Sequence, residues 1–203
     1  MNRHGGELPF SQACENNKTA ILEKLLNIFA DRKTVLEFGS GTGQHASWFA
    51  QHMPWFTWQP TDIAGNLPTL LPRCAAYPGS NLLAATPLDV TKKPWSVPVP
   101  SAVFTANSLH IMPFAAVQDL FKALGEMAES DTVLVVYGPF NYGGKYTSDS
   151  NARFDQWLHQ QHPLSAIRDF EGVGELANSA GFALEGDHVM PANNRLLVWR
   201  KSV

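Results

Sequence analysis

The stretch TVLEFGSGTGQHASWF, residues 34–49, places three glycines at alternate positions between a short apolar run and a helical pattern. Its apolar start predicts a short buried strand over residues 35–38. The residues after the glycines predict a helix through Ala50, which Pro54 ends because proline interrupts helical hydrogen bonding. The stretch therefore predicts a strand, a tight loop and a helix in direct succession.

The three glycines predict a loop that approaches a ligand closely. Gly39, Gly41 and Gly43 let the backbone turn tightly with no Cβ in the way, and the helix that follows offers unpaired amide groups. A dinucleotide fingerprint would place its third glycine at position 44, where this chain has Gln44. The loop favours a nucleoside ligand over a dinucleotide, with a purely structural turn as the alternative.

Three acidic residues stand where a nucleoside ligand would meet them. Glu37 precedes the first glycine and could pair with an ammonium group. Asp62 ends a second predicted strand about 20 residues after the glycines, the interval of a ribose-binding carboxylate. Asp89, at the end of a third predicted strand over residues 82–90, could accept from an adenine amino group. Capping of a helix is the structural alternative for each strand-terminal acid.

The rest of the chain continues to alternate strands and helices. This order predicts an α/β fold with a mostly parallel sheet and helices on both faces. The final pair of strands, joined through MPANN, must be antiparallel because a parallel crossover needs a longer connection. Residues 64–80 predict helix only in short pieces, and residues 139–150 predict a long functional loop. The further expected segments are helices over 13–29 and 115–128 and strands over 56–62, 101–110, 132–140 and within 182–201.

Composition limits the partners and the compartment. The 203 residues carry a net charge of −3 with no lysine and arginine run, which disfavours nucleic acid. No apolar stretch approaches the roughly 20 residues of a membrane span, and the first ten residues lack an apolar signal core, so we expect a cytoplasmic protein. Cys14 and Cys74 are expected to be reduced thiols. His159 and His162 have no acidic or cysteine cluster beside them, so no metal is expected.

The assembled motifs resemble those of class I S-adenosylmethionine-dependent methyltransferases. The signature is E-x-G-x-G-x-G after the first strand, an acid on the second, LDV on the third and ANSLHIMP on the fourth. From about Phe10 to Trp199 the chain also resembles the uncharacterised family typified by methyltransferase-like protein 26. The segments that carry this resemblance are FSQACENNKTAILEKL, LEFGSGTGQHASWFA, TWQPTDI, YGPFNYGGKYT, SNARFD and MPANN. One departure is Asn16, where relatives typically have arginine.

The resemblance implies a Rossmann-like, seven-stranded sheet with the last strand antiparallel, in one domain over residues 1–203. Its N-terminal helical segment, residues 1–30, would pack near the site of S-adenosylmethionine and of the product S-adenosylhomocysteine. Asp62 would contact the ribose, Asp89 with Val90 the adenine, and Asn107 would lie under the sulfonium. The full set of implied cofactor-binding residues is Asn17, Glu37, Gly39, Ser40, Gly41, Gly43, Gln44, Asp62, Asp89, Val90 and Asn107.

Candidate catalytic residues follow the fourth and fifth predicted strands. His110 is the first candidate for a general base, with a histidine packed against its loop as the alternative, and Tyr137 is the second. The predicted lining of the acceptor pocket is Phe140, Asn141 and Tyr142. YGPF is not the N-P-P-[YF] arrangement of enzymes that methylate amino groups of nucleobases or glutamine.

These observations predict a methyltransferase for a small-molecule acceptor, acting as a monomer or homodimer. A protein that binds the cofactor without catalysis is the first alternative. An NAD(P)-dependent oxidoreductase is disfavoured by Gln44 and by the antiparallel final pair. His45, in the first turn after the glycines, could touch the cofactor or lie on the helix surface.

Overall fold

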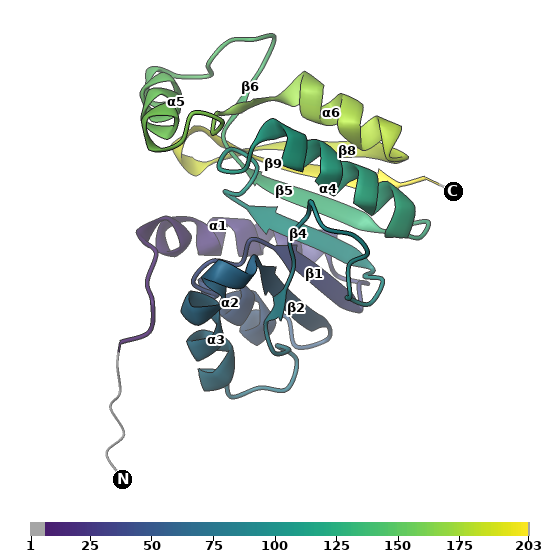
Figure 1. Cartoon of the computed structure of the whole chain (residues 1–203). Helices are drawn as coiled ribbons and strands as arrows, with labels where there is room; N and C mark the ends of the chain where they lie inside the picture. Colours follow the sequence, from purple (N-terminus) through teal and green to yellow (C-terminus); the bar gives the residue numbers. More distant parts are fainter. Residues whose placement is uncertain (1–6, 203) are drawn as a thin grey trace.

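The computed structural model describes residues 7–202, in which helices and strands alternate along most of the chain (Figure 1). The first half comprises α1 (Gln12–Ile28), β1 (Thr34–Phe38), α2 (Gln44–His52), β2 (Thr57–Asp62), η1 (Ala64–Asn66), α3 (Leu67–Ala76), β3 (Thr86–Pro87) and β4 (Ala102–Ala106). The second half comprises α4 (Phe114–Met127), β5 (Val133–Gly138), β6 (Phe140–Asn141), α5 (Asp149–Gln161), β7 (Arg168–Asp169), α6 (Phe170–Ser179), β8 (Phe182–Met190), η2 (Pro191–Asn193) and β9 (Asn194–Lys201).

Within the described residues the main sheet has seven strands in the order β3-β2-β1-β4-β5-β9-β8. The pairs from β3 to β5 are parallel, and β9 is antiparallel to both β5 and β8. This arrangement confirms the predicted fold class. The strand order reverses between β1 and β4, and open sheets of this kind bind ligands beyond the carboxyl ends of the strands at such a point.

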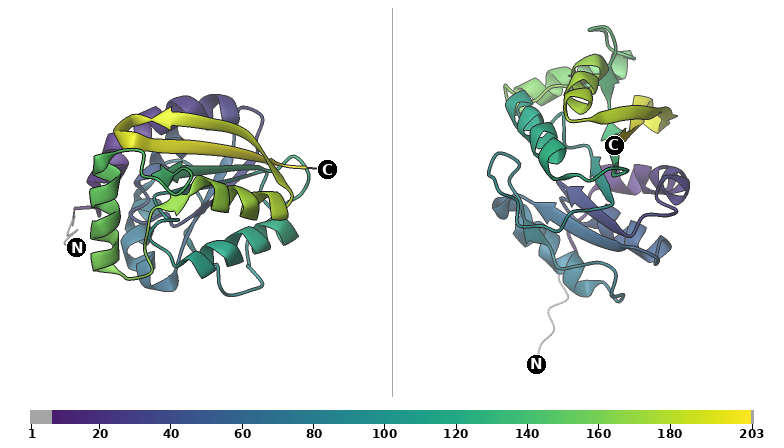
Figure 2. Two further views of the ribbon diagram at one scale, coloured as in Figure 1. Left: turned by 90° about the horizontal axis from the view of Figure 1, so that it is seen from above. Right: turned by 90° about the vertical axis from the view of Figure 1, so that its right-hand side faces the viewer.

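Two apolar clusters fill the two faces of the sheet. Successive side chains of a strand point to opposite faces, so Val35 joins a first core cluster with α1 and α2, whereas Leu36 joins a second with α4 and α6. Figures 1 and 2 show these helix pairs on opposite sides of the sheet. The strands β1, β4 and β5 are therefore covered on both faces, as their continuous apolar sequences predict.

The helix α1 forms largely where its apolar spacing predicts. Ser11 caps it by accepting a hydrogen bond from the Cys14 amide. Ile21 and Leu25, one helical turn apart, are fully buried against the sheet. Complete burial of two such side chains contributes about 3 to 6 kcal/mol to folding, which fixes α1 over the first core cluster.

Two predicted segments differ from the structure. The strand expected over residues 82–90 is reduced to Thr86–Pro87 at the edge of the sheet, where Pro87 has no amide to donate. The α3 helix continues through Pro72 instead of breaking into pieces. Buried Leu70 anchors α3, and Arg73 ties it to the glycine loop by donating to the Thr42 carbonyl.

The segment after β5 is also more ordered in structure than predicted. Its residues form β6, which pairs with β7, and the next helix, α5, begins at Asp149 after Ser148 caps it. The Asp155 carboxylate in α5 accepts from the Ile167 amide at 2.6 Å, which holds the helix against the segment before β7. Residues 139–150 are therefore a structured connection.

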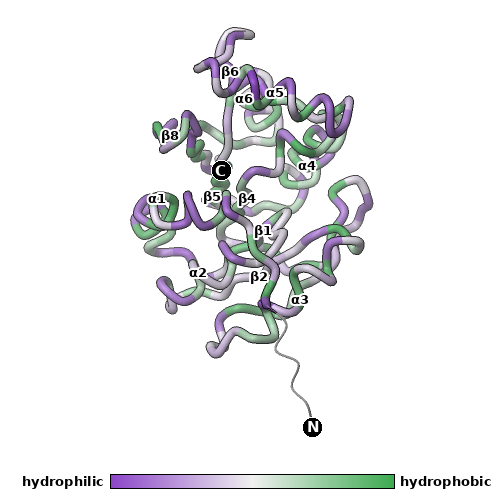
Figure 3. The backbone as a smooth tube through the Cα atoms, turned by 90° about the vertical axis from the view of Figure 1, so that its left-hand side faces the viewer, coloured by the Kyte–Doolittle hydropathy of each residue, from purple (hydrophilic) through white to green (hydrophobic). Residues whose placement is uncertain are grey.

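The helices α1 and α5 border the carboxyl ends of the parallel strands. Figure 2 shows α5 crossing one end of the sheet, and Figure 3, seen from that side, places α1 and α5 on either side of β4 and β5. Asn151 of α5 donates to the Asn193 carbonyl in the turn between β8 and β9. The predicted division into one domain stays a prediction, and residues 1–6 and 203 lie outside the described residues.

Candidate functional site

The glycine loop adopts a conformation that only glycine takes without strain. Gly39, Gly41 and Gly43 have φ angles of +67°, +56° and +72°. A Cβ added to Gly39 would lie 2.5 Å from Ser108 Oγ, whereas one added to Gly41 would meet nothing within 4 Å. The loop is thus packed against β4's end at its first glycine and open at its second. This open backbone is where a ligand can approach.

Glu37 lies beneath the loop with its side chain buried. Its Oε2 accepts from Ser40 Oγ at 2.7 Å and from Trp58 Nε1 at 2.9 Å. Burial raises the pKa of Glu37 to about 7, although both hydrogen bonds favour its charged form. A cationic ligand group nearby would shift this carboxyl towards the charged form. Glu37 and Ser40 are therefore in direct contact, and the Ser40 hydroxyl donates its hydrogen bond to the Glu37 carboxylate.

Asp62 ends β2 and clamps the glycine loop. Its Oδ2 accepts from the Gly41 amide at 2.8 Å, and its Oδ1 accepts from the Ile63 amide and from Asn66 Nδ2, both at 2.8 Å. A carboxylate has about four acceptor positions, so one remains for a ligand hydroxyl. Asp62 therefore lies against the glycine loop, and it also holds the loop in place through the Gly41 amide.

Asp89 and Val90 follow the short β3. The Asp89 side chain accepts from the Thr91 amide at 3.0 Å and from Thr91 Oγ1 at 2.7 Å, and these hydrogen bonds lower its pKa. Val90 packs against the second core cluster. Asp89 thus stabilises the turn over residues 89–91 through its own side chain. Its predicted contact with an adenine stays a prediction.

The N-terminal segment lies against the glycine loop. Gln44 Oε1 accepts hydrogen bonds from the Ser11 amide and from Thr42 Oγ1. Arg73 donates to the carbonyls of Thr42 and Pro9. Through these contacts the Gln44 side chain joins the start of α1 to the loop. The prediction that the N-terminal helical segment packs near a cofactor site stays a prediction.

A cluster of buried and partly buried polar side chains lies where α1, α2 and β5 meet. His45 Nε2 lies 2.6 Å from Asn17 Oδ1, and its Nδ1 lies 3.8 Å from Cys14 Sγ. Burial lowers the pKa of His45 to about 4 and raises that of Tyr137. The Asn17 and Asn194 side chains partly offset this rise in the pKa of Tyr137. His45 is therefore in the interior, not on the helix surface that its position also allowed, because α1 covers this turn of α2.

Asn107 and His110 converge over Gly138. Asn107 ends β4 with a φ of +56°, and its amide donates to the Tyr137 carbonyl at 2.8 Å. A Cβ added to Gly138 would lie 3.6 Å from His110 Nδ1 and 3.9 Å from Asn107 Oδ1. Burial lowers the pKa of His110 to about 4, so the imidazole is neutral near pH 7. A neutral imidazole beside the end of β5 can accept a hydrogen bond from an acceptor hydroxyl or amine, but this low pKa makes it a weak base.

The three residues predicted to line an acceptor pocket lie at and just after β6, and each has different surroundings. Phe140 is buried in the second core cluster, and Tyr142 stacks on Phe170 while its hydroxyl donates to Asp187 Oδ2 at 2.9 Å. That hydroxyl's pKa is raised, first by burial. Asn141 Oδ1 is buried with no hydrogen-bond partner. Phe140 and Tyr142 therefore have packing positions, and their predicted role in lining an acceptor pocket stays a prediction.

Other residues at this edge were missed by the sequence interpretation. Phe154 of α5 meets the His110 ring edge to face at 5.3 Å, and Asn194 reaches Tyr137. Ala192 and Asn193, before β9, both have a φ of +57°. Such strain in non-glycine residues clusters at functional sites. The MPANN turn and the SNARFD segment, which contains Phe154, were the available signals.

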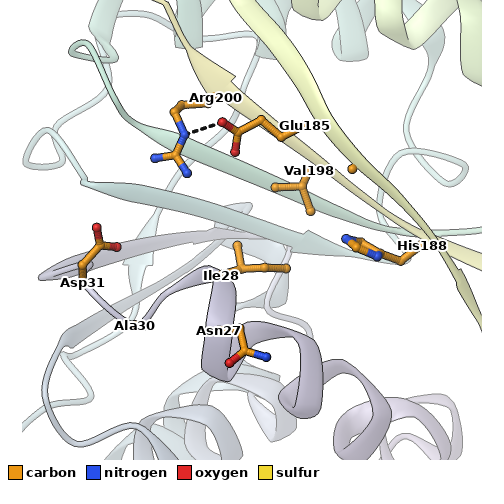
Figure 4. Close-up of a pocket in the computed structure, with 9 residues that line it drawn as sticks. Asn27, Ile28, Ala30, Asp31, Glu185, His188, Val198 and Arg200 are labelled. Atoms are coloured by element: carbon orange, nitrogen blue, oxygen red, sulfur yellow. Dashed lines mark hydrogen bonds and ion pairs between the residues drawn. The ribbon is translucent and has the colours of Figure 1, made fainter.

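A surface groove lies elsewhere. It has a volume of about 510 Å³ and runs between the end of α1 and the strands β8 and β9. Figure 4 shows Arg200 paired with Glu185 on its wall, and Arg200 is also aligned with Val133 at the start of β5. The groove is therefore towards the amino ends of the parallel strands, opposite the glycine loop. Among residues 7–202 no three histidine, cysteine or acidic residues are grouped to hold a metal.

The sheet order gives this chain the fold of S-adenosylmethionine-dependent methyltransferases, as comparison with solved structures shows. The chain belongs to the family described as "Protein of unknown function (DUF938)", whose model matches residues 8–201. That description does not confirm the resemblance to methyltransferase-like protein 26.

Three solved structures illustrate the similarity of fold. An O-methyltransferase family protein from Burkholderia thailandensis matches with a TM-score of 0.80 and 14% identity, over 91% of this chain and 56% of that chain. A putative O-methyltransferase from Nostoc punctiforme gives 0.79 and 17%, over 93% and 56%. Human N-acetylserotonin methyltransferase in complex with S-adenosylmethionine gives 0.70 and 14%, over 95% and 59%. The chain thus spans little more than half the length of these proteins.

In the part of the chain that the structure describes, no helix has the length and hydrophobicity to cross a membrane.

Proposed function

We propose that this chain is an S-adenosylmethionine-dependent methyltransferase that acts on a small molecule. The observation that carries the proposal is the convergence of His110 and Asn107 over Gly138, at the same sheet edge as the open glycine loop. A protein that only binds the nucleoside needs the loop but has no need of a neutral imidazole at the strand ends. The methyltransferase fold supports the same conclusion.

The residues around the loop fit the cofactor. Gly41 gives a ligand free access to the backbone, and Asp62 retains one acceptor position for a ribose hydroxyl. Glu37 would pair with the ammonium group of the methionine moiety, and Asn107 would lie near the sulfonium. Bound S-adenosylmethionine would supply a methyl group whose bond to sulfur breaks, with its electron pair left on sulfur, as the acceptor atom bonds to the methyl carbon.

The protein's own task is to align the acceptor and remove its proton. His110 accepts the proton of the acceptor hydroxyl or amine at a ring nitrogen. The helix α5 crosses one end of the sheet and would limit the access of water there (Figure 2). Orientation of two reactants can lower a barrier by about 7 to 11 kcal/mol in well-oriented cases.

Calorimetric titration with S-adenosylhomocysteine tests the proposal. We expect binding by the unaltered chain and a loss of about 1 to 3 kcal/mol in Asp62→Ala, because a hydrogen bond to the ribose and the clamp on Gly41 disappear. Asp119→Ala, on α4 away from the loop, is the matched control and should bind normally. Preferential binding of NADH would contradict the proposal and favour an oxidoreductase.

The finer predictions belong to this proposal. Methyl transfer, and not binding alone, distinguishes the enzyme from a cofactor-binding protein, and incubation with labelled cofactor and an acceptor panel measures it. Membership in the family of methyltransferase-like protein 26, a monomeric or homodimeric state and a cytoplasmic location stay predictions from the sequence.

A further inference from the structure

We infer that the methyl acceptor is a neutral aromatic hydroxyl compound whose ring binds against α5, beside Phe154 and Trp157. The inference rests on the proposed function and deepens it by naming the substrate class. It uses the residues of α5, which the motifs of the cofactor site do not include.

An aromatic series leads from the proposed base to solvent. The His110 ring is 5% exposed and meets Phe154 edge to face, with ring centroids 5.3 Å apart. Phe154 in turn stacks on Trp157 at 5.7 Å with an interplanar angle of 15°. Trp157 is 51% exposed. Stacked rings at the surface favour a planar ligand, because aromatic pairs gain energy from offset and edge contacts.

The surface beside this series is apolar. Ile111 and Leu164 are each 59% exposed, and Phe114 is 40% exposed. Ser165 Oγ donates to the Ile111 carbonyl at 2.6 Å, so the segment after α5 lies against the loop that carries His110. Clustered exposed apolar side chains beside a candidate site indicate a binding surface, here for a ligand with apolar faces.

The charged groups near His110 are already occupied. Arg168 is buried and donates Nε to the Leu109 carbonyl at 3.0 Å and Nη2 to the Leu164 carbonyl at 3.0 Å. Asp155 accepts from Tyr146 Oη at 2.7 Å and from the Ile167 amide at 2.6 Å. Neither Arg168 nor Asp155 is therefore free to pair with a charged acceptor, whose loss of hydration beside His110 would be costly. A neutral compound avoids that cost.

A matched set of bicyclic probes tests the charge and the ring separately. Naphthol, naphthoate and naphthylmethylamine share one ring system and differ in charge, and decahydronaphthol keeps the hydroxyl without the aromatic ring. Ligand-observed NMR on the full chain with S-adenosylhomocysteine measures their dissociation constants. We expect naphthol to bind more tightly than the other three. Equal or tighter binding of either charged probe, or of decahydronaphthol, would overturn the inference.

A pair of tryptophan variants tests the place of binding. Trp157→Ala should weaken naphthol binding about two- to tenfold, the effect of losing one aromatic pair. Trp55→Ala is the matched control, because Trp55 is 47% exposed and Trp157 51%, and it should change nothing. Equal effects of the two variants would place the ligand elsewhere and overturn the inference.

The same titrations separate the two proposals. If S-adenosylhomocysteine binds and naphthol shows no preference, the inference fails and the proposed function stands. If S-adenosylhomocysteine does not bind, the proposed function fails and the inference fails with it.

Discussion

Two regions lie at the carboxyl ends of the parallel strands: the loop half, around the glycine loop, and the His110 half, around His110. They are built in different ways. The loop half consists of one continuous segment, residues 37–44, together with Asp62. Its shape depends mainly on the backbone conformation of the three glycines. The His110 half combines side chains from α1, β5, α5 and the turn before β9, as the contacts of Tyr137 and Phe154 show. A cofactor-type site can thus be local in sequence while the site beside it is dispersed.

The two halves also differ in charge. The loop half contains the carboxyl groups of Glu37 and Asp62, whereas the other half presents the imidazole of His110, whose pKa burial lowers to about 4. The first half therefore suits a ligand with cationic and hydroxyl groups, and the second suits a neutral one. Each of the following predictions tests one side of this difference.

The largest effect is expected from closing the glycine loop. Gly39→Ala would force a Cβ to within 2.5 Å of Ser108 Oγ at a φ of +67°, so we expect a loss of about 2 to 5 kcal/mol in the free energy of unfolding. Urea denaturation measures it. Gly41→Ala is the matched control, since its Cβ has open space, and should lose only about 1 to 2 kcal/mol. Equal losses would show that backbone conformation alone decides both positions.

The buried histidines should make the fold sensitive to acid. Burial lowers the pKa values of His45 and His110 to about 4, below their ordinary value near 6.5. Between these pH values the unfolded chain binds more protons, so stability falls as the pH drops from about 6.5 to 4, by up to about 3 kcal/mol for each histidine. Denaturation curves over this range measure the slope, which His45→Gln and His110→Gln should each reduce. An unchanged slope would show that these histidines are protonated in the folded chain.

An effect of opposite sign is expected from Glu37. Burial raises its pKa to about 7, above the ordinary value near 4.5, so the folded chain binds more protons between these values. Its contribution to stability is therefore lost as the pH rises from about 4.5 to 7, by up to about 3 kcal/mol. Glu37→Gln should remove this loss and leave the acid sensitivity of the histidines steeper, as measured by the same curves. A flatter profile in that variant would contradict the assignment.

Local sequence predicted the loop half well, and the reason is physical. The three left-handed residues need glycine, and the strand and helix beside them follow apolar periodicity. The third strand was predicted too long because Pro87 and its edge position limit pairing, which local hydrophobicity does not report. The interior place of His45 depends on α1 covering it, a tertiary fact that no local pattern contains.

The other half could be predicted only in part. His110 follows β4 and Tyr137 lies near the end of β5, positions that a sequence can locate, and their catalytic roles stay predictions. Phe154 lies on a helix far along the chain, and contacts between distant segments, such as that of Asn151 with the Asn193 carbonyl, hold this helix near His110. Phe140 is buried in the second core cluster, which its position in the sequence does not reveal.

The strained turn at Ala192 and Asn193 has a consequence for the order in which the protein is completed. The Asn193 carbonyl holds α5 through Asn151, and Asn194 reaches Tyr137. Chains fold as they emerge from the ribosome, with earlier segments first. The glycine loop has its partners once β4 is made, whereas the His110 half must wait for β9. A nascent chain would therefore form the proposed cofactor site at the glycine loop before it forms the proposed acceptor site at His110.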